Sequence, residues 1–128
     1  MPFPLDHIVI YAADAAASGS FYSCLLDALG FERRRDGVFA RDGFFLDIRE
    51  MLNDSPARER GQRGVDHIGF KATSRGEVDA IDQVMRSAGF NGRLIEFDGG
   101  DYALFLPDPD GVRIEITCYS DPSGDPVD

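Results

Sequence analysis

The segments "LDHIVI" (residues 5–10) and "VDHIGF" (residues 65–70) contain the only two histidines of the 128-residue chain, His7 and His67. The similarity continues in two further pairs of segments: "LGF" (29–31) with "AGF" (88–90), and "RDGFFLDI" (41–48) with "PDGVRIEI" (109–116). Self-similarity at a nearly constant spacing indicates a repeated structural unit. The chain is therefore predicted to contain two copies of one module, with Asp47 in the place that Glu115 takes in the second copy.

The first module is predicted to follow the order β-α-β-β-β. Apolar and β-branched residues make "LDHIVIYA" (5–12) a strand. Asp14 is a suitable N-cap for a helix over residues 15–29, which Gly30 ends. Three strands are expected near 31–35, 38–41 and 44–50.

The second module repeats this order. Ser74 and Glu77 form the sequence signature of a capping box at the start of its helix, and Gly89 ends that helix. Its remaining strands are expected near 92–97, 102–106 and 112–119. The predicted fold class is α+β, two β-α-β-β-β modules forming a curved mixed sheet.

The length of the chain is enough for one domain with its own core. We expect module 1 at about 4–50, a polar segment at 51–64, module 2 at about 65–119, and an acidic, frayed tail at 120–128. The segment at 51–64 is rich in Gly, Pro and Arg, and is either a linker or a mobile flap.

Composition and charge exclude several classes of partner. The net charge of -10 would repel a phosphate backbone, so we expect no nucleic acid. No apolar run is long enough to span a membrane, and the N-terminus has no signal-peptide pattern, so a cytoplasmic protein with no membrane partner is expected. Cys24 and Cys118 are predicted to be free thiols.

Strand alternation places the four residues of interest on comparable faces. In an extended strand, residues two apart share a face. His7, His67, Asp47 and Glu115 are therefore all predicted to lie opposite the helix-packing face of their sheet. If the two faces meet, imidazoles and carboxylates gather in one concavity, a composition that suits Zn²⁺, Ni²⁺, Co²⁺, Mn²⁺ or Fe²⁺.

The chain resembles the vicinal oxygen chelate superfamily, which includes glyoxalase I, extradiol dioxygenases, fosfomycin-resistance proteins and bleomycin-resistance proteins. The resemblance covers roughly residues 4–119 and rests on "LDHIVIYAADAAASGSFYSCLLDALGF", "GVDHIGFKA" and "YALFLPDPDGVRIEI". It implies a curved sheet around a divalent metal ion, assembled as a homodimer. It also implies that His7, His67 and Glu115 are the metal ligands.

The resemblance leaves the role of Asp47 open. Glyoxalase-I-like enzymes have a glutamate ligand at the end of the first module, where this chain has Asp47. Its side chain is shorter by one methylene, about 1.5 Å, which is large beside the ~0.2 Å tolerance of a metal–ligand distance. Asp47 is therefore expected to act through water or as a general base rather than as a direct ligand.

The implied activity is metal-dependent chemistry on a small-molecule substrate, with Asp47 and Glu115 as the catalytic candidates. Glyoxalase-I-like lyase or isomerase chemistry is favoured. Two alternatives are an extradiol-type dioxygenase with two histidines and one glutamate around iron, and a metal-free binding protein that sequesters its ligand. Further candidates to line a pocket are Tyr11, Phe45, Arg49, Lys71, Tyr102 and Arg113.

Overall fold

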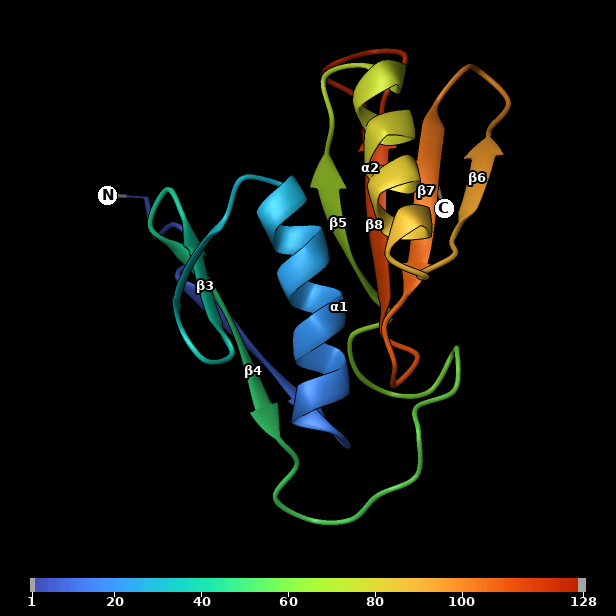
Figure 1. The fold of residues 1–128 in the computed structure, drawn as a ribbon. Coiled ribbons are helices and arrows are strands. Elements are labelled where there is room, and N and C mark those ends of the chain that lie inside the picture. Colours follow the sequence, from blue (N-terminus) through green and yellow to red (C-terminus); the bar gives the residue numbers. More distant parts are fainter. Residues whose placement is uncertain (1, 127–128) are drawn as a thin grey trace. The chain divides into compact units, whose positions relative to one another are not determined.

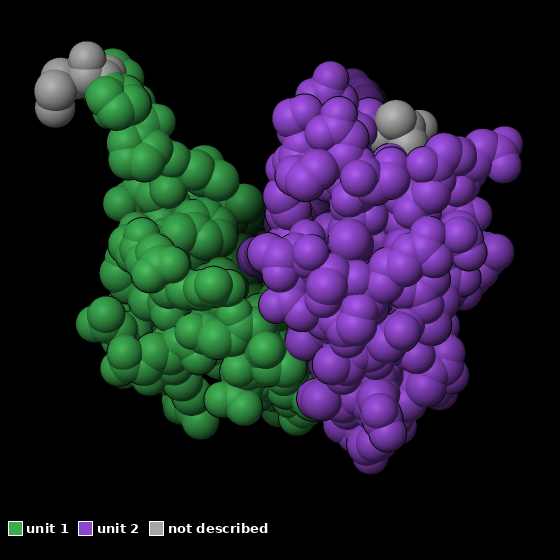
Figure 2. Space-filling view, turned by 90° about the horizontal axis from the view of Figure 1, so that it is seen from above, with its two compact units in different colours: residues 1–57 green, residues 58–128 purple. Residues whose placement is uncertain are grey.

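The computed structural model describes residues 2–126, which divide into two compact units. Unit 1 comprises residues 1–57 and unit 2 comprises residues 58–128 (Figure 2). The polar segment predicted at 51–64 is thus divided, and its second half belongs to unit 2. The predicted single domain stays a prediction.

Unit 1 contains one four-stranded mixed sheet and one helix (Figure 1). The elements are β1 (His7–Ala12), α1 (Ala15–Ala28), β2 (Glu32–Arg35), β3 (Val38–Arg41) and β4 (Phe44–Glu50). The strand order is β1-β4-β3-β2, and β1 runs parallel to β4 while the other pairs are antiparallel. This is the predicted β-α-β-β-β order.

Unit 2 repeats this topology. Its elements are β5 (His67–Lys71), α2 (Arg75–Ser87), β6 (Arg93–Glu96), β7 (Tyr102–Pro107) and β8 (Arg113–Cys118). The strand order is β5-β8-β7-β6, with β5 parallel to β8. The α+β class and the two modules are confirmed, and each module forms its own sheet.

Both helices begin as the sequence predicts. The carboxylate of Asp14 accepts hydrogen bonds from the backbone N–H groups of Ala16 and Ala17, and the hydroxyl of Ser74 accepts one from the N–H of Glu77. The capping box differs in one respect. The carboxylate of Glu77 accepts from the backbone N–H and the hydroxyl of Thr73, at 2.6 and 2.7 Å, one residue before the expected partner.

One side of each sheet forms a core with the helix. In unit 1, α1 contributes the fully buried Phe21 and Leu25, which lie on the side of β4 that carries Leu46. In unit 2, α2 lies across β7 and β8 (Figure 1), where Val78, Met85, Leu104, Leu106 and Ile114 are fully buried. Burial of such side chains stabilises each unit by about 1.5–3 kcal/mol per residue.

The segment "DPDG" (108–111) makes the turn that leads into β8. The buried carboxylate of Asp108 accepts hydrogen bonds from the N–H groups of Asp110 and Val112 at 2.8 and 2.9 Å. Gly111 has φ +86°, which only glycine adopts without strain. The turn thus sets the starting point of β8 and, through it, the position of Glu115.

Two smaller observations complete the fold. Cys24 and Cys118 are free, as predicted, and both are half-buried. Among the described residues, neither helix is long and apolar enough to cross a membrane.

Candidate functional site

The candidate residues lie on the side of each sheet that is turned away from its helix, called here the helix-free face. In unit 2, β5 and β8 pair so that Gly69 lies opposite Glu115 and His67 lies opposite Arg113. Ile114 and Ile116 point to the helix side and are buried, so the alternating residues Arg113, Glu115 and Thr117 share the helix-free face with His67. The sequence prediction for this face of unit 2 is confirmed.

His67 and Glu115 are in direct contact. Nε2 of His67 lies 3.0 Å from Oε2 of Glu115, and the second carboxylate oxygen, Oε1, accepts a 2.5 Å hydrogen bond from the hydroxyl of Thr117. Glu115 is only 4% exposed, so its carboxylate depends on these partners. Gly69 leaves room for it, because even an added Cβ there would lie 4.0 Å from Oε2.

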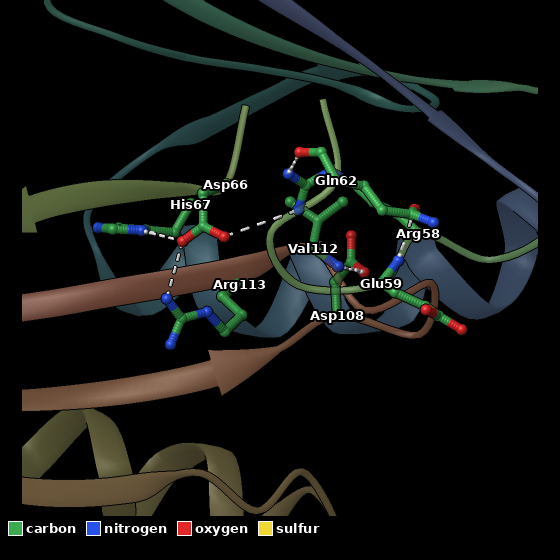
Figure 3. Close-up of polar contacts among 8 residues, drawn as sticks. All are labelled: Arg58, Glu59, Gln62, Asp66, His67, Asp108, Val112 and Arg113. Carbon is green, nitrogen blue, oxygen red and sulfur yellow. Dashed lines mark hydrogen bonds and ion pairs between the residues drawn. The ribbon is translucent and has the colours of Figure 1, made fainter. Parts of the chain in front are cut away.

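Asp66 holds the other side of the His67 ring (Figure 3). Its Oδ2 lies 2.7 Å from Nδ1 of His67 and accepts a 2.9 Å hydrogen bond from Nη2 of Arg113. These hydrogen bonds, that of His67 first, hold the pKa of Asp66 well below its ordinary value. A carboxylate on one ring nitrogen is the arrangement that orients metal-binding histidines through the other nitrogen.

Arg58 and Arg113 both approach Asp66. Nη1 of Arg58 lies 3.9 Å from Oδ1 of Asp66, and its Nη2 donates to the backbone oxygen of Gln62, which secures the loop before β5 (Figure 3). The guanidinium of Arg113 lies 5.1 Å from the ring centroid of Phe105. The ring of Phe105 in turn packs edge-on against His67, with centroids 6.4 Å apart.

The two carboxylate contacts of His67 require more hydrogen-bond donors than a neutral imidazole has. A neutral imidazole has one N–H group, yet both nitrogens of His67 face carboxylate oxygens. One of the two contacts would then bring a lone pair against a carboxylate, whichever tautomer is present. An additional proton or a cation between Nε2 and Oε2 removes this repulsion. The pair is therefore suited to take up a proton or a metal ion.

Unit 1 has the same backbone arrangement with different side-chain partners. His7 lies opposite Phe45, and Val9 lies opposite Asp47, as His67 and Gly69 lie opposite Arg113 and Glu115. Nδ1 of His7 lies 2.7 Å from Oδ2 of Asp6, which repeats the Asp66–His67 contact. Both histidines therefore have Nδ1 against the preceding aspartate and Nε2 directed away from it.

The carboxylate of Asp47 is held by Arg49. Oδ2 of Asp47 accepts hydrogen bonds from Nε and Nη2 of Arg49 at 2.9 and 2.7 Å, and the hydrogen bond to Asp47 raises the pKa of Arg49. Arg49 takes the place that Thr117 has in unit 2. The short, ion-paired carboxylate of Asp47 thus differs from that of Glu115, which contacts a histidine.

A cavity of about 350 Å³ opens beside His67 and Glu115. Gly69, Lys71 and Thr117 line it from the sheet, and Tyr119, Gly124 and Pro126 line it from the C-terminal segment. Nζ of Lys71 donates to the backbone oxygen of Pro122 at 3.2 Å and lies over the Tyr119 ring. The tail, as far as Pro126, therefore lies beside β5 and β8 within unit 2. Its fraying stays a prediction, and residues 127 and 128 lie outside the described part.

The predicted pocket residues divide into three groups. Lys71 and Arg113 lie on the helix-free face of unit 2, and Tyr11, Phe45 and Arg49 lie on that of unit 1. Tyr102 is placed differently. Its hydroxyl donates to Asp79 of α2 at 2.5 Å, and this hydrogen bond raises the pKa of Tyr102. Tyr102 thus lies on the helix side of the sheet, away from His67.

Asp66, Thr117 and Tyr119 belong to the site but were not predicted from the sequence. The role of Asp66 could have been predicted from the repeat, because an aspartate precedes both histidines. The role of Thr117 could have been predicted from strand alternation, because it lies two residues after Glu115 and so shares its face. Tyr119 follows the last strand, where alternation gives no direction.

The metal-ligand set is divided between the units. His7 belongs to unit 1, and His67 and Glu115 belong to unit 2. Within residues 2–126, no group of three or more His, Cys, Asp or Glu side chains is gathered as a metal site. What the structure shows is one imidazole–carboxylate pair, His67 with Glu115, oriented by Asp66 and Thr117.

The chain is similar in sequence to one protein family and to a Bacillus subtilis protein. Residues 4–116 match the model of the Glyoxalase/Bleomycin resistance protein/Dioxygenase superfamily. The uncharacterized protein YqjT of Bacillus subtilis (strain 168) is 29% identical over 127 residues, which cover 91% of this chain and 99% of that protein.

Among solved structures, a candidate glyoxalase from Bacillus halodurans aligns with a TM-score of 0.75 and 26% identity, covering 89% of this chain and 94% of the other. A glyoxalase/dioxygenase from Nostoc punctiforme aligns with a TM-score of 0.72 and 22% identity, covering 92% of each chain. At this lower identity the likeness concerns the fold alone.

Proposed function

Because this chain belongs to the Glyoxalase/Bleomycin resistance protein/Dioxygenase superfamily, we propose that it is a metal-dependent enzyme acting on a small molecule, by glyoxalase-I-like lyase or isomerase chemistry. One observation carries this proposal. His67 and Glu115 meet at 3.0 Å, and each is oriented by a second residue on its far side. A likeness also extends to the lactoylglutathione lyase of Agrobacterium tumefaciens, at 21% identity and a TM-score of 0.63.

The residues present fit a divalent metal ion in composition. Nε2 of His67 and Oε2 of Glu115 would hold the ion, together with His7, and the absence of a thiolate from this set suits a catalytic rather than a structural site. When bound, such an ion would supply Lewis-acid polarisation of neighbouring substrate oxygens.

The chain's own residues have distinct tasks in this proposal. Asp66 keeps Nδ1 of His67 occupied, so that Nε2 is directed into the site, and Thr117 keeps Oε1 of Glu115 occupied, so that Oε2 is presented. Asp47 would take a proton next to a substrate carbonyl through Oδ1, because Oδ2 is bound by Arg49.

A second candidate function has its own observation. The ion pair between Asp47 and Arg49 occupies the candidate for a fourth ligand and leaves two histidines and one glutamate. That set is the one that activates oxygen in non-haem iron enzymes. An extradiol-type dioxygenase is therefore the second candidate.

Metal content tests the proposal directly. Protein purified without chelator and with any tag removed is expected to contain about one divalent ion per chain by elemental analysis. Glu115→Gln, which keeps the volume and loses the charge, and His67→Gln should both lose most of that metal, whereas the matched control Asp47→Asn should keep it. Circular dichroism verifies that each variant is folded. Absence of metal, even after reconstitution, would reject the enzyme proposal in favour of a ligand-sequestering protein.

Activity then separates the two chemistries. Isomerisation of the hemithioacetal of methylglyoxal and a thiol, lost in Asp47→Asn with metal retained, is the result expected for the lyase. The dioxygenase instead predicts oxygen consumption with catechols that requires iron and is unchanged in Asp47→Asn. That result would reject the lyase proposal. The homodimer expected from the resemblance is part of the proposal, and light scattering in solution tests it.

A further inference from the structure

A second cavity lies on the helix-free face of unit 2. It has a volume of about 660 Å³, a size that holds a small organic molecule. Its lining includes Arg60 from the loop before β5, Arg93 and Ile95 from β6, Phe105 from β7 and Arg113 from β8. Arg93 lies opposite Phe105 in the ladder, so these residues share the face that carries His67 and Glu115.

The apolar part of this cavity is aromatic. The rings of Phe97 and Phe105 pack edge to face with centroids 6.5 Å apart, and Ile95 lies beside them. Phe105 is 8% exposed, so its ring is a fixed surface rather than a mobile side chain. Such a surface favours a flat, apolar molecule.

The charged part of the cavity is uniformly positive. The chain has 23 acidic residues against 13 basic ones, yet no acidic side chain of residues 2–126 lines this cavity, while three arginines do. Arg113 uses Nη2 to hold Asp66, and Arg60 and Arg93 have no ion pair within the same residues. Two guanidinium groups without a counter-charge, beside a third whose Nη2 is paired with Asp66, favour a planar anion such as a carboxylate.

The cavity adjoins the His67–Glu115 pair through shared residues. Phe105 packs against the ring of His67, and Arg113 hydrogen-bonds to the carboxylate that orients this ring. A molecule held on the arginines and on Phe105 therefore lies next to the proposed reaction centre.

We propose that this cavity binds an aromatic carboxylate, with the carboxylate on Arg60, Arg93 and Arg113 and the ring on Phe97 and Phe105. The inference goes beyond the proposed function: it assigns a ligand class to a cavity next to the proposed reaction centre, and it does not identify the molecule that reacts there. Binding itself requires only the residues of the cavity.

Titration with 2-naphthoate tests the proposal. The chain has no tryptophan, so the fluorescence of the ligand can be excited at wavelengths longer than those that the four tyrosines absorb. We expect saturable binding that weakens about tenfold in the double variant Arg60→Gln/Arg93→Gln, because two charged hydrogen-bond donors are lost. The matched control is Arg63→Gln, an exposed arginine of the same loop that does not line the cavity, and it should bind as the wild type does.

Two further measurements keep the inference separate from the proposed function. The neutral 2-naphthamide should bind at least tenfold more weakly than 2-naphthoate if the arginines recognise the charge. Glu115→Gln, expected to be metal-free, should still bind 2-naphthoate, and metal-loaded wild-type protein should bind it with similar affinity. Binding that occurs only with metal, equal binding of the amide, or no effect of the double variant would overturn the inference, whatever the metal analysis shows.

Discussion

Replacing Thr117 by valine removes one hydrogen bond and almost no volume. The hydroxyl of Thr117 donates to Oε1 of Glu115 at 2.5 Å, and both residues are 4% exposed. A hydrogen bond to a charged group contributes about 1.5–3 kcal/mol, and its loss leaves a buried carboxylate oxygen with one donor fewer. We therefore expect Thr117→Val to lower the free energy of unfolding by about 2 kcal/mol.

Urea unfolding followed by circular dichroism measures this effect. With an m-value of about 2 kcal/mol/M, the midpoint should fall by about 1 M. Thr117→Ser is the matched control, because it keeps the hydroxyl and loses a methyl group worth about 0.8 kcal/mol. If the valine variant is as stable as the serine variant or more so, the hydrogen bond does not hold Glu115 and the reasoning fails. The valine variant should also bind metal about 10–100-fold more weakly under the proposed function.

Three further predictions concern the fold. The carboxyl of Glu77 has its pKa lowered from 4.5 by hydrogen bonds from Thr73, so it contributes stability above about pH 4.5 that is lost as the pH falls through the lowered value; Glu77→Gln should flatten this acid loss in unfolding curves measured from pH 6 to pH 2. Asp108→Ala should cost about 2–3 kcal/mol in urea unfolding, because two N–H groups lose their acceptor, whereas Asp108→Asn should cost less; equal losses would contradict the role of the acceptor. Gly37→Ala should cost more than Gly43→Ala by thermal unfolding, because both have positive φ but only a Cβ at Gly37 would lie 2.4 Å from a backbone oxygen; equal costs would show that φ alone decides.

Most of the fold could be predicted because the sequence carries it locally. The repeat around His7 and His67 gave the module, the caps at Asp14 and Ser74 gave the helix starts, and alternation in β8 gave the faces. The caps and the alternation are properties of neighbouring residues, and the repeat is read by aligning two segments of the sequence. None of them depends on how distant segments meet in space.

The incorrect expectation for Tyr102 has an equally local reason. The strand "YALFLP" is apolar at both alternating sets of positions, so periodicity could not tell which set faces α2. The ion pair of Asp47 with Arg49 was accessible in principle, because residues two apart on a strand share a face. The contact of Asp66 with His67 was not accessible through alternation, because Asp66 precedes the first residue of β5.

The correspondence between the modules also has an evolutionary reading. If the modules descend from one ancestral sequence, the Asp-His dipeptide persisted in both copies, while divergence changed the neighbours that decide what the carboxylate meets. On the paired strands, Val9, Asp47 and Arg49 in one copy correspond to Gly69, Glu115 and Thr117 in the other. The triple exchange Val9→Gly/Asp47→Glu/Arg49→Thr is therefore expected to form a second imidazole–carboxylate pair in unit 1, between His7 and the side chain at position 47.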